Sequence, residues 1–360
     1  LLEKAERIFP DGDFYLTKEE SAMVEQVQQL FPKVAVVMNV GGMVDTDWFA
    51  ENEKIQAVLM AWQGGMEGGN AAAELLCGVG SPSGKLSDTF AKKLEDYPSS
   101  ETFHESVKYV DYKEDIYVGY RYYSSAGVGV RYPFGHGLSY TSFAYSDLAV
   151  DEGGVSFTLA NTGAVPGDEV AQLYFTPPES GYYRPRLNLC GFARVHLSPG
   201  ESRRVRIDLD PGALAVWTDR GRLTPGGTYR LALGSSSEDI RLEAELGLAG
   251  DELPEPPETP DWYFAPSGTP GTADFERLLG RRLPARALRR GLYTMENTLL
   301  DIHGDSRLAR VVYRAMELVI ARASGGDRNS PEYRMMLSSA ADASLSGMQI
   351  NGGVRGPWLR

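Results

Sequence analysis

The stretch Val34-Ala35-Val36-Val37-Met38-Asn39-Val40 is an almost continuous apolar run. A run of this length without alternation is typical of a β-strand that is buried on both faces, as in a parallel sheet. A second run, Ala57-Val58-Leu59-Met60-Ala61-Trp62, has the same pattern, and helices are expected at 17–31, 47–53 and 70–77. Helices that alternate with buried strands predict a parallel α/β sheet. Because only two or three such strands are present, we expect the sheet to be incomplete within this chain.

The predicted helices have recognisable ends. Thr17 is a good N-cap and Glu20 stands three residues later, which is the spacing of a capping box. Pro32 ends this first helix, and Gly78 ends the helix at 70–77. The apolar residues that share one face of the first helix are Met23, Val24, Val27, Leu30 and Phe31.

The pattern changes after the second strand and its helix. Residues 81–145 are rich in aromatic and turn residues, which predicts an extended, wrapping segment with little regular helix. From 143 to 248 apolar residues alternate with polar ones, as at Val155, Phe157 and Leu159, and turn clusters separate the runs. Short strands at this spacing predict a β-sandwich.

The last third of the chain is different again. Residues 250–271 are rich in proline and acidic residues, which predicts a linker, and helices are expected at 275–279, 306–323 and 331–347. The fold class is therefore α/β plus all-β. The predicted domains are 1–142 (a partial α/β sandwich domain, incomplete at its N-terminus), 143–248 (a β-sandwich), 249–271 (a linker) and 272–360 (a helical extension).

Composition excludes several classes of function. The 360 residues carry a net charge of -13, which argues against non-specific binding to nucleic acid or to an anionic membrane. No apolar run approaches the roughly 20 residues of a membrane span, and four scattered histidines have no metal-ligand spacing. Cys77 and Cys190 fall in different predicted domains, so we expect two reduced thiols and a cytoplasmic location. No cofactor is expected.

Three motifs resemble those of a known family. They are Ala61-Trp62-Gln63-Gly64-Gly65-Met66-Glu67-Gly68-Gly69-Asn70-Ala71 with Gly80-Ser81-Pro82-Ser83-Gly84-Lys85-Leu86, then Glu114-Asp115-Ile116-Tyr117-Val118-Gly119-Tyr120-Arg121-Tyr122, then Tyr132-Pro133-Phe134-Gly135-His136-Gly137-Leu138-Ser139-Tyr140-Thr141. In this order they resemble the C-terminal α/β domain of glycoside hydrolase family 3, in which Gln stands where Met66 stands here. The sandwich at 143–248 resembles the fibronectin type III-like domain that follows in many members.

The resemblance implies a retaining exo-β-glycosidase of the β-glucosidase type. Such an enzyme needs two carboxyl groups about 5–5.5 Å apart, one as nucleophile and one as acid/base. In this family the nucleophile lies in an N-terminal (β/α)₈ barrel, for which this chain has no room. We therefore expect the chain to be part of a longer enzyme and inactive alone, with the barrel domain and a β-glycoside as its partners.

Glu3 falls on the position of the family's acid/base glutamate. The family loop reads Ser-Gly-Glu-Gly-x-Asp-Arg, and the matching residues here are Leu1-Leu2-Glu3-Lys4-Ala5-Glu6-Arg7. Lys4 in place of a glycine is a departure that matters, because a neighbouring ammonium lowers the pKa that a general acid needs raised. The competing interpretation is that Glu3 is a solvated charge.

Other motifs also have two interpretations. The loop 64–69 could hold a phosphate, but it lacks the usual phosphate-loop spacing, and a tight strand-to-helix turn is favoured. The tyrosines at 117, 120, 122 and 123 could stack on a sugar, but packing is favoured, as it is for Trp48 and Trp62. The arginines at 277–290 are expected to form a solvated face or to pair with the acidic linker.

A second hypothesis is a free-standing, non-catalytic module that binds a carbohydrate or a partner protein through the sandwich. The sequence leaves the sugar open between glucose, xylose and N-acetylglucosamine, with glucose first, and it leaves the oligomeric state open.

Overall fold

The computed structural model describes residues 14–102, 110–283, 293–295, 297–341 and 343–347. The chain forms two compact units. The larger unit contains residues 1–102 and 112–281, and the smaller contains 103–111 and 282–360.

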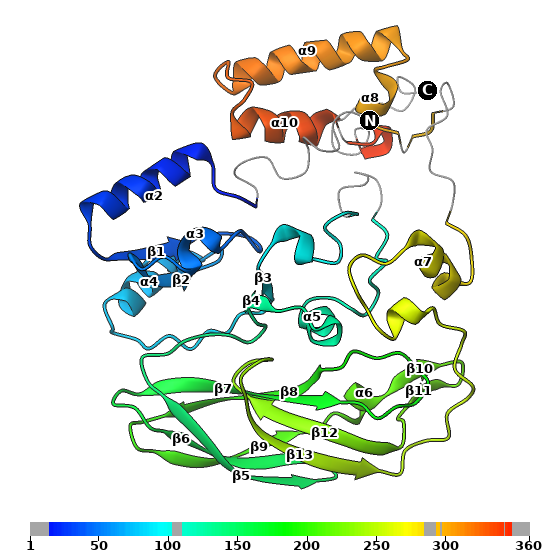
Figure 1. The fold of residues 1–360 in the computed structure, drawn as a ribbon. Coiled ribbons are helices and arrows are strands. Elements are labelled where there is room, and N and C mark those ends of the chain that lie inside the picture. Colours follow the sequence, from blue (N-terminus) through cyan, green and yellow to red (C-terminus); the bar gives the residue numbers. More distant parts are fainter. Residues whose placement is uncertain (1–13, 103–109, 284–292, 296, 342, 348–360) are drawn as a thin grey trace. The chain divides into compact units, whose positions relative to one another are not determined.

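The larger unit begins with the predicted parallel α/β arrangement (Figure 1). Strands β1 (Val34–Met38) and β2 (Ile55–Met60) pair in parallel, with Met38 opposite Met60. The helices around them are α2 (Lys18–Leu30), α3 (Asp47–Ala50) and α4 (Gly68–Leu76). The order helix, strand, helix, strand, helix is the predicted one.

The predicted ends of α2 and α4 are confirmed. The Thr17 hydroxyl accepts a hydrogen bond from the Glu20 N–H at 3.1 Å, and the Glu20 carboxylate accepts one from the Thr17 N–H at 2.8 Å. This is the reciprocal pair of a capping box. Gly78, two residues beyond α4, has a φ of 74°, which glycine adopts without steric cost.

The burial predicted for the strands is wrong for the described part of the chain. Val37 of β1 is 44% exposed and Val58 of β2 is 37% exposed, and α2 contains no buried residue. A strand in a parallel sheet is buried only where helices cover both faces and other strands cover both edges. Among the described residues, β1 and β2 form a sheet of two strands only.

A segment with little regular structure follows, as predicted. It contains β3 (Phe90–Ala91), the 3₁₀ turn η1 (Leu94–Asp96), α5 (Tyr120–Ala126) and β4 (Val130–Tyr132). β3 and β4 pair antiparallel although they lie far apart in the sequence. The segment therefore returns on itself between the α/β part and the sandwich.

The predicted β-sandwich is confirmed and consists of two antiparallel sheets. One sheet has the order β13-β12-β7-β8 and the other β5-β6-β9. Alternating residues such as Val155, Phe157 and Leu159 are fully buried in the core between the sheets. The strands are β5 (Phe143–Asp151), β6 (Gly154–Asn161), β7 (Gly167–Thr176), β8 (Asn188–Leu197), β9 (Ser202–Asp208), β12 (Gly227–Gly234) and β13 (Ile240–Leu248), with α6 (Pro211–Leu214) and the hairpin β10 (Val216–Thr218) and β11 (Gly221–Leu223) between β9 and β12.

The segment 249–271, predicted as a linker, is part of the larger unit and contributes to its core. It contains the turn η2 (Asp261–Tyr263), and Tyr263 is fully buried against Tyr117 and its neighbours. The helix α7 (Thr272–Leu279) follows and begins earlier than predicted.

The smaller unit is helical, as predicted. It contains α8 (Leu299–Ile302), α9 (Arg307–Ala323) and α10 (Pro331–Ala341), and α10 is shorter than expected. Ile320 and Ala321 of α9 pack against Tyr333 of α10 in a small core.

Candidate functional site

The predicted acid/base residue, Glu3, lies outside the described residues. The first described residue, Phe14, is buried, and its carbonyl accepts a hydrogen bond from the Asp45 N–H at 2.9 Å. Its ring makes edge contacts with Tyr15 and Tyr97, at centroid distances of 5.0 and 6.3 Å. Phe14 is therefore anchored to the loop after β1.

That loop lies at the edge where ligands bind in open α/β folds. β1 and β2 run in parallel and end side by side at Met38 and Met60, and the Ala61 N–H extends the ladder to the Met38 carbonyl at 2.9 Å. Ligands of such sheets bind outside the carboxyl ends of the strands. We take this carboxyl edge, with the loops 39–46 and 61–67, as the candidate site.

Two glycines permit close approaches at this edge, Gly41 in the loop after β1 and Gly64 in the first motif. A Cβ atom on Gly41 would lie 3.0 Å from the Gln63 amide nitrogen, and one on Gly64 would lie 3.0 Å from the Gly68 Cα. The loop 64–69 is thus a tight strand-to-helix turn, which is the interpretation favoured from the sequence. Glu67 accepts a hydrogen bond from the Asn70 amide at 2.5 Å, and the adjacent Met66 is fully exposed.

The two tryptophans near this edge are half-buried and pack against phenylalanines. Trp62 has a φ of 52°, which is rare for a bulky residue, and its ring lies 6.2 Å from that of Phe90. The Trp48 indole donates to the Asp45 carbonyl at 3.1 Å and meets Phe49 edge to face. These contacts agree with the packing role that was predicted.

One arginine forms ion pairs with a carboxylate of α3 and with the carboxylate just after this helix. Arg131 donates to Asp47 at 2.6 Å and to Glu51 at 3.0 Å. Burial raises the pKa of the Tyr15 phenol, and the nearby carboxylates Glu95, Asp45 and Asp47 raise it further. The phenol therefore stays protonated and can donate a hydrogen bond.

Sequence reasoning missed two carboxyl groups. Burial raises the pKa of Asp88, which lies beside Gly119, and burial also raises the pKa of Glu114 in the second motif. Raised carboxyl pKa values mark residues that can hold a proton. The available signal was an acidic residue close to aromatic residues, which sequence patterns do not distinguish from a solvated charge.

The first and third motifs meet at a joint between the α/β part and the sandwich. Lys85 forms a 3.0 Å ion pair with Glu169 of β7, and the two side chains are only 14% and 8% exposed. The Gly135 N–H donates to the Leu86 carbonyl, and the Leu86 N–H donates to the His136 carbonyl, both at 2.8 Å. These motif residues hold one domain to the next.

Gln172 of β7 completes this joint. Its amide donates to the Gly135 carbonyl at 3.3 Å and to the Ser235 carbonyl at 2.7 Å, and it accepts from the Tyr174 hydroxyl at 2.5 Å. A Cβ atom on Gly135 would lie 2.1 Å from the Gln172 oxygen. Glycine is thus required where the third motif crosses the sandwich.

The tyrosines of the second motif pack rather than form an open platform. Tyr117, Tyr122 and Tyr123 are almost fully buried, together with Tyr263. The Tyr120 ring stacks on Phe134 at 4.7 Å, and its hydroxyl accepts from the Leu189 N–H at 2.9 Å. The predicted packing role is confirmed.

Part of the predicted pairing between the arginine run and the acidic segment is also observed. Arg277 donates to Glu258 at 3.0 Å, whereas Arg281 and Arg282 are exposed. Arg286, Arg289 and Arg290 lie outside the described residues.

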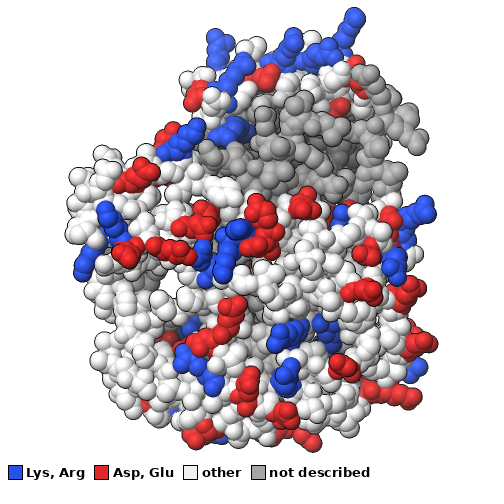
Figure 2. Space-filling view, in the orientation of Figure 1, with Lys and Arg blue, Asp and Glu red and all other residues white. Residues whose placement is uncertain are grey.

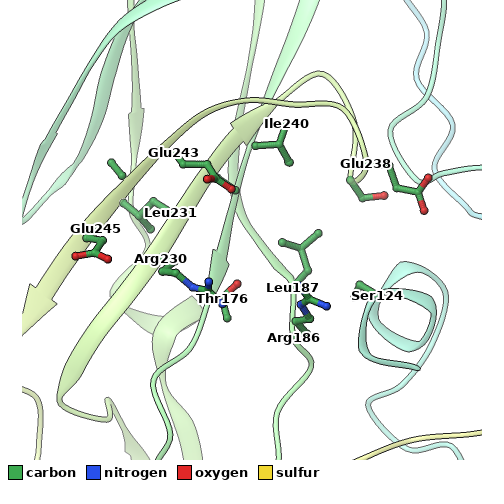
Figure 3. Close-up of a pocket in the computed structure, with 13 residues that line it drawn as sticks. Ser124, Thr176, Arg186, Leu187, Arg230, Leu231, Glu238, Ile240, Glu243 and Glu245 are labelled. Carbon is green, nitrogen blue, oxygen red and sulfur yellow. The ribbon is translucent and has the colours of Figure 1, made fainter. Parts of the chain in front are cut away.

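A groove of about 500 Å³ crosses the outer face of the sandwich beside α5 (Figure 3). Arg230 of β12 lies beside its cross-strand neighbour Glu245 of β13 on the sheet, with Glu243 further along β13. Arg186 and Leu187 line the groove on the side of α5. A groove with both signs of charge favours neither a strongly anionic nor a strongly cationic ligand. Acidic and basic side chains are likewise interspersed over the visible face of the sandwich, in the lower part of Figure 2.

The described residues contain no group of three or more His, Cys, Asp or Glu side chains that could hold a metal ion. Within the same residues, no helix is both long and apolar enough to cross a membrane. Cys77 is exposed and Cys190 is buried, and both are unpaired.

Comparison with known proteins places these features in a family. Residues 4–140 match the glycosyl hydrolase family 3 C-terminal domain, and residues 169–237 match the fibronectin type III-like domain. The chain is 49% identical over 271 residues to beta-glucosidase A from Butyrivibrio fibrisolvens. This alignment covers 67% of this chain and 33% of that protein. The chain is homologous to the beta-glucosidases of glycosyl hydrolase family 3.

Solved structures of this family agree with the fold. Beta-glucosidase 3B from Thermotoga neapolitana, solved in complex with glucose, has a TM-score of 0.62 and 36% identity, covering 66% of this chain and 35% of that chain. A family 3 beta-glucosidase from Bifidobacterium adolescentis has a TM-score of 0.60 and 27% identity, covering 83% and 40%. The chain spans about a third of the length of the curated relatives it matches.

The match to the C-terminal domain of family 3 begins at residue 4 and contains the three motifs up to Tyr140. Glu3 stands one residue ahead of that match, so its catalytic role stays a prediction.

Proposed function

We propose that this chain forms the C-terminal part of a retaining exo-β-glycosidase of the β-glucosidase type. The observation that carries the proposal is the match of two successive domains to enzymes named beta-glucosidases. The glucose complex of the Thermotoga neapolitana homologue supports a glucoside as the first substrate to test. A relative from Bifidobacterium breve, 36% identical over 245 residues, is named an exo-alpha-(1->6)-L-arabinopyranosidase, so arabinopyranosides belong in the same panel.

In this proposal Glu3 is the general acid/base and a carboxylate of the family's barrel domain is the nucleophile. Glu3 protonates the departing glycosidic oxygen as the nucleophile attacks the anomeric carbon, and it then removes a proton from the water that hydrolyses the glycosyl-enzyme. One carboxyl group cannot perform both roles, so this chain alone does not turn over substrate. The unpaired state of Cys77 and Cys190 supports the further proposal of a cytoplasmic location.

The test is hydrolysis by a fusion of this chain to a family 3 barrel, beside the chain alone. The substrates are the p-nitrophenyl β-D-glucoside, β-D-xyloside, β-D-N-acetylglucosaminide and α-L-arabinopyranoside. We expect activity in the fusion only, and Glu3→Gln should lower kcat by about 10²–10⁴-fold. The matched control is Glu19→Gln, an exposed carboxylate in the first turn of α2.

Substrates with different leaving groups distinguish a general acid from a residue that has only a structural role. A 2,4-dinitrophenolate departs without protonation, so Glu3→Gln should slow bond cleavage in an alkyl glucoside far more than in the dinitrophenyl glucoside. An equal loss on both would refute the acid role. Turnover by the chain alone, above a contaminant control, would refute the claim that its catalytic pair is incomplete.

A further inference from the structure

The groove on the outer face of the sandwich has the size and the position of a ligand site. Its volume of about 500 Å³ is within the range of about 300–1,000 Å³ that small-molecule sites occupy. Ser124 of α5 lines it on one side, and Ser237 and Glu238 of the turn between β12 and β13 line it on another (Figure 3). The groove therefore lies where α5 meets the sandwich, and boundaries between domains are common places for ligand sites.

Hydrogen-bond donors and acceptors alternate across the strands beneath the groove. Arg230 of β12 has Glu245 of β13 as its cross-strand neighbour on one side and Thr176 of β7 on the other. Glu243 lies two residues from Glu245 and on the same face, because the side chains of a strand alternate between faces. Three further residues add apolar lining: Leu187, Ala232 and Ile240. The groove thus combines polar groups of both kinds with a small apolar area.

The charged side chains of the groove make no hydrogen bond or ion pair with any residue that the structure describes. They are Arg186, Arg230, Glu238, Glu243 and Glu245, and all are exposed. Elsewhere on the sandwich, Arg194, Arg206 and Arg241 each donate to a carboxylate, at 2.8, 2.7 and 2.6 Å. Arg230 and Glu245 face each other across the strands without such a bond, although opposite charges at these positions attract. The groove therefore keeps donors and acceptors available for a ligand.

These groups fit a ligand that both donates and accepts hydrogen bonds. A guanidinium group only donates and a carboxylate only accepts, whereas a hydroxyl group does both. The two arginines and three glutamates are close to charge balance, which favours a neutral ligand over a strongly charged one. A sugar meets both conditions, because it carries several hydroxyl groups on a neutral ring whose C–H faces suit apolar lining.

We propose that the groove is a non-catalytic carbohydrate site, which binds a neutral gluco-oligosaccharide on the outer face of the sandwich. Arg186 and Arg230 donate to its hydroxyl groups, and Glu243 and Glu245 accept from them. Because the lining side chains are exposed, a chain of linked sugars fits as well as a single one. The choice of glucose units rests on the proposed function, whereas the site itself rests on the groove alone.

The experiment is isothermal titration calorimetry of the full chain with cellotetraose and with laminaritetraose. We expect a Kd between about 0.1 and 1 mM for at least one of them. Arg230→Ala and Glu243→Ala should each weaken binding about tenfold or more, because each removes a hydrogen bond from a charged group to the sugar. Ser124→Trp should abolish binding, since an indole at this position fills the groove beside α5.

Two exposed residues outside the groove provide matched controls. Arg220→Ala, in the turn between β10 and β11, and Glu152→Ala, in the turn between β5 and β6, should leave the Kd unchanged. The Tm of every variant is measured alongside, so that a loss of binding is distinguished from a loss of folding.

Absence of binding to either tetrasaccharide at about 10 mM would overturn the proposal, as would equal weakening by the groove variants and the controls. Binding by the chain needs no turnover, so this failure would leave the proposed hydrolase intact. Tetrasaccharide binding by a chain whose barrel fusion is inactive would contradict the proposed function and leave the groove site standing.

Discussion

Replacing Gly135 by alanine tests whether the third motif exists to join two domains. Gly135 has a φ of 82°, and a Cβ atom there would overlap the Gln172 amide oxygen at 2.1 Å. The left-handed backbone costs a residue with a Cβ about 1–2 kcal/mol. Displacing Gln172 also breaks its bonds to the Gly135 and Ser235 carbonyls and to the Tyr174 hydroxyl, at about 1 kcal/mol each. The expected total is about 4–5 kcal/mol.

The assay is native-state hydrogen exchange at the joint. The Leu86 N–H bonds to the His136 carbonyl and the Ser237 N–H bonds to the Phe134 carbonyl, so both amides report on opening of this contact. The control is Gly200→Ala, since Gly200 has a similar φ of 75° but no atom within 4 Å of the added Cβ. Gly135→Ala should lower the free energy of opening at the joint by about 3 kcal/mol more than Gly200→Ala does. Exchange of the two amides should then be roughly 100-fold faster in Gly135→Ala than in the control.

A double mutant isolates the part of the cost of Gly135→Ala that comes from the overlap with Gln172. In a Gln172→Ala background the overlap is gone, so Gly135→Ala should cost only the backbone contribution of about 1–2 kcal/mol. If Gly135→Ala cost no more than Gly200→Ala in the unaltered background, the close approach would have no energetic role. The assignment of this motif to the joint would then be wrong.

Two further predictions concern the same joint. Lys85→Met should cost about 3–5 kcal/mol in unfolding free energy, because it leaves the buried Glu169 carboxylate without its ion-pair partner and with the Val170 N–H as a remaining donor. Arg277→Met, at the exposed pair with Glu258, should cost less than about 1 kcal/mol. Denaturant unfolding of both variants checks this, and equal costs would contradict it. Burial and then Lys85 lower the pKa of His136 below 6.5. As the pH falls, His136 therefore takes up a proton in the unfolded chain at a higher pH than in the folded chain. The contribution of neutral His136 to stability is present above pH 6.5 and is lost as the pH falls from 6.5 towards the lower pKa of the folded state. The difference in unfolding free energy between the unaltered chain and His136→Gln should shrink over that window, and a difference independent of pH would refute the prediction.

The site was predictable only in part. Gly135 of the third motif stood out in the sequence, but the reason for a glycine there lies in Gln172, which only folding brings near. Asp88 and Glu114 were missed because burial raises their carboxyl pKa values, and burial is a property of the surroundings. Glu3 was assigned by resemblance and lies outside the described residues, so its role depends on the kinetic test.

The sequence by itself determined the local elements and their order. Apolar runs, the Thr17 capping box and the period of two in the sandwich are properties of neighbouring residues, and local geometry is enough to specify them. It could not determine what covers each element, because burial depends on segments far away in the chain or outside it. The run at 34–40 was expected to be buried on both faces, yet Val37 is 44% exposed, and the proline-rich segment expected to be a linker buries Tyr263 against Tyr117. The tertiary structure decided both outcomes, since a side chain is buried only when a partner surface is present to exclude water.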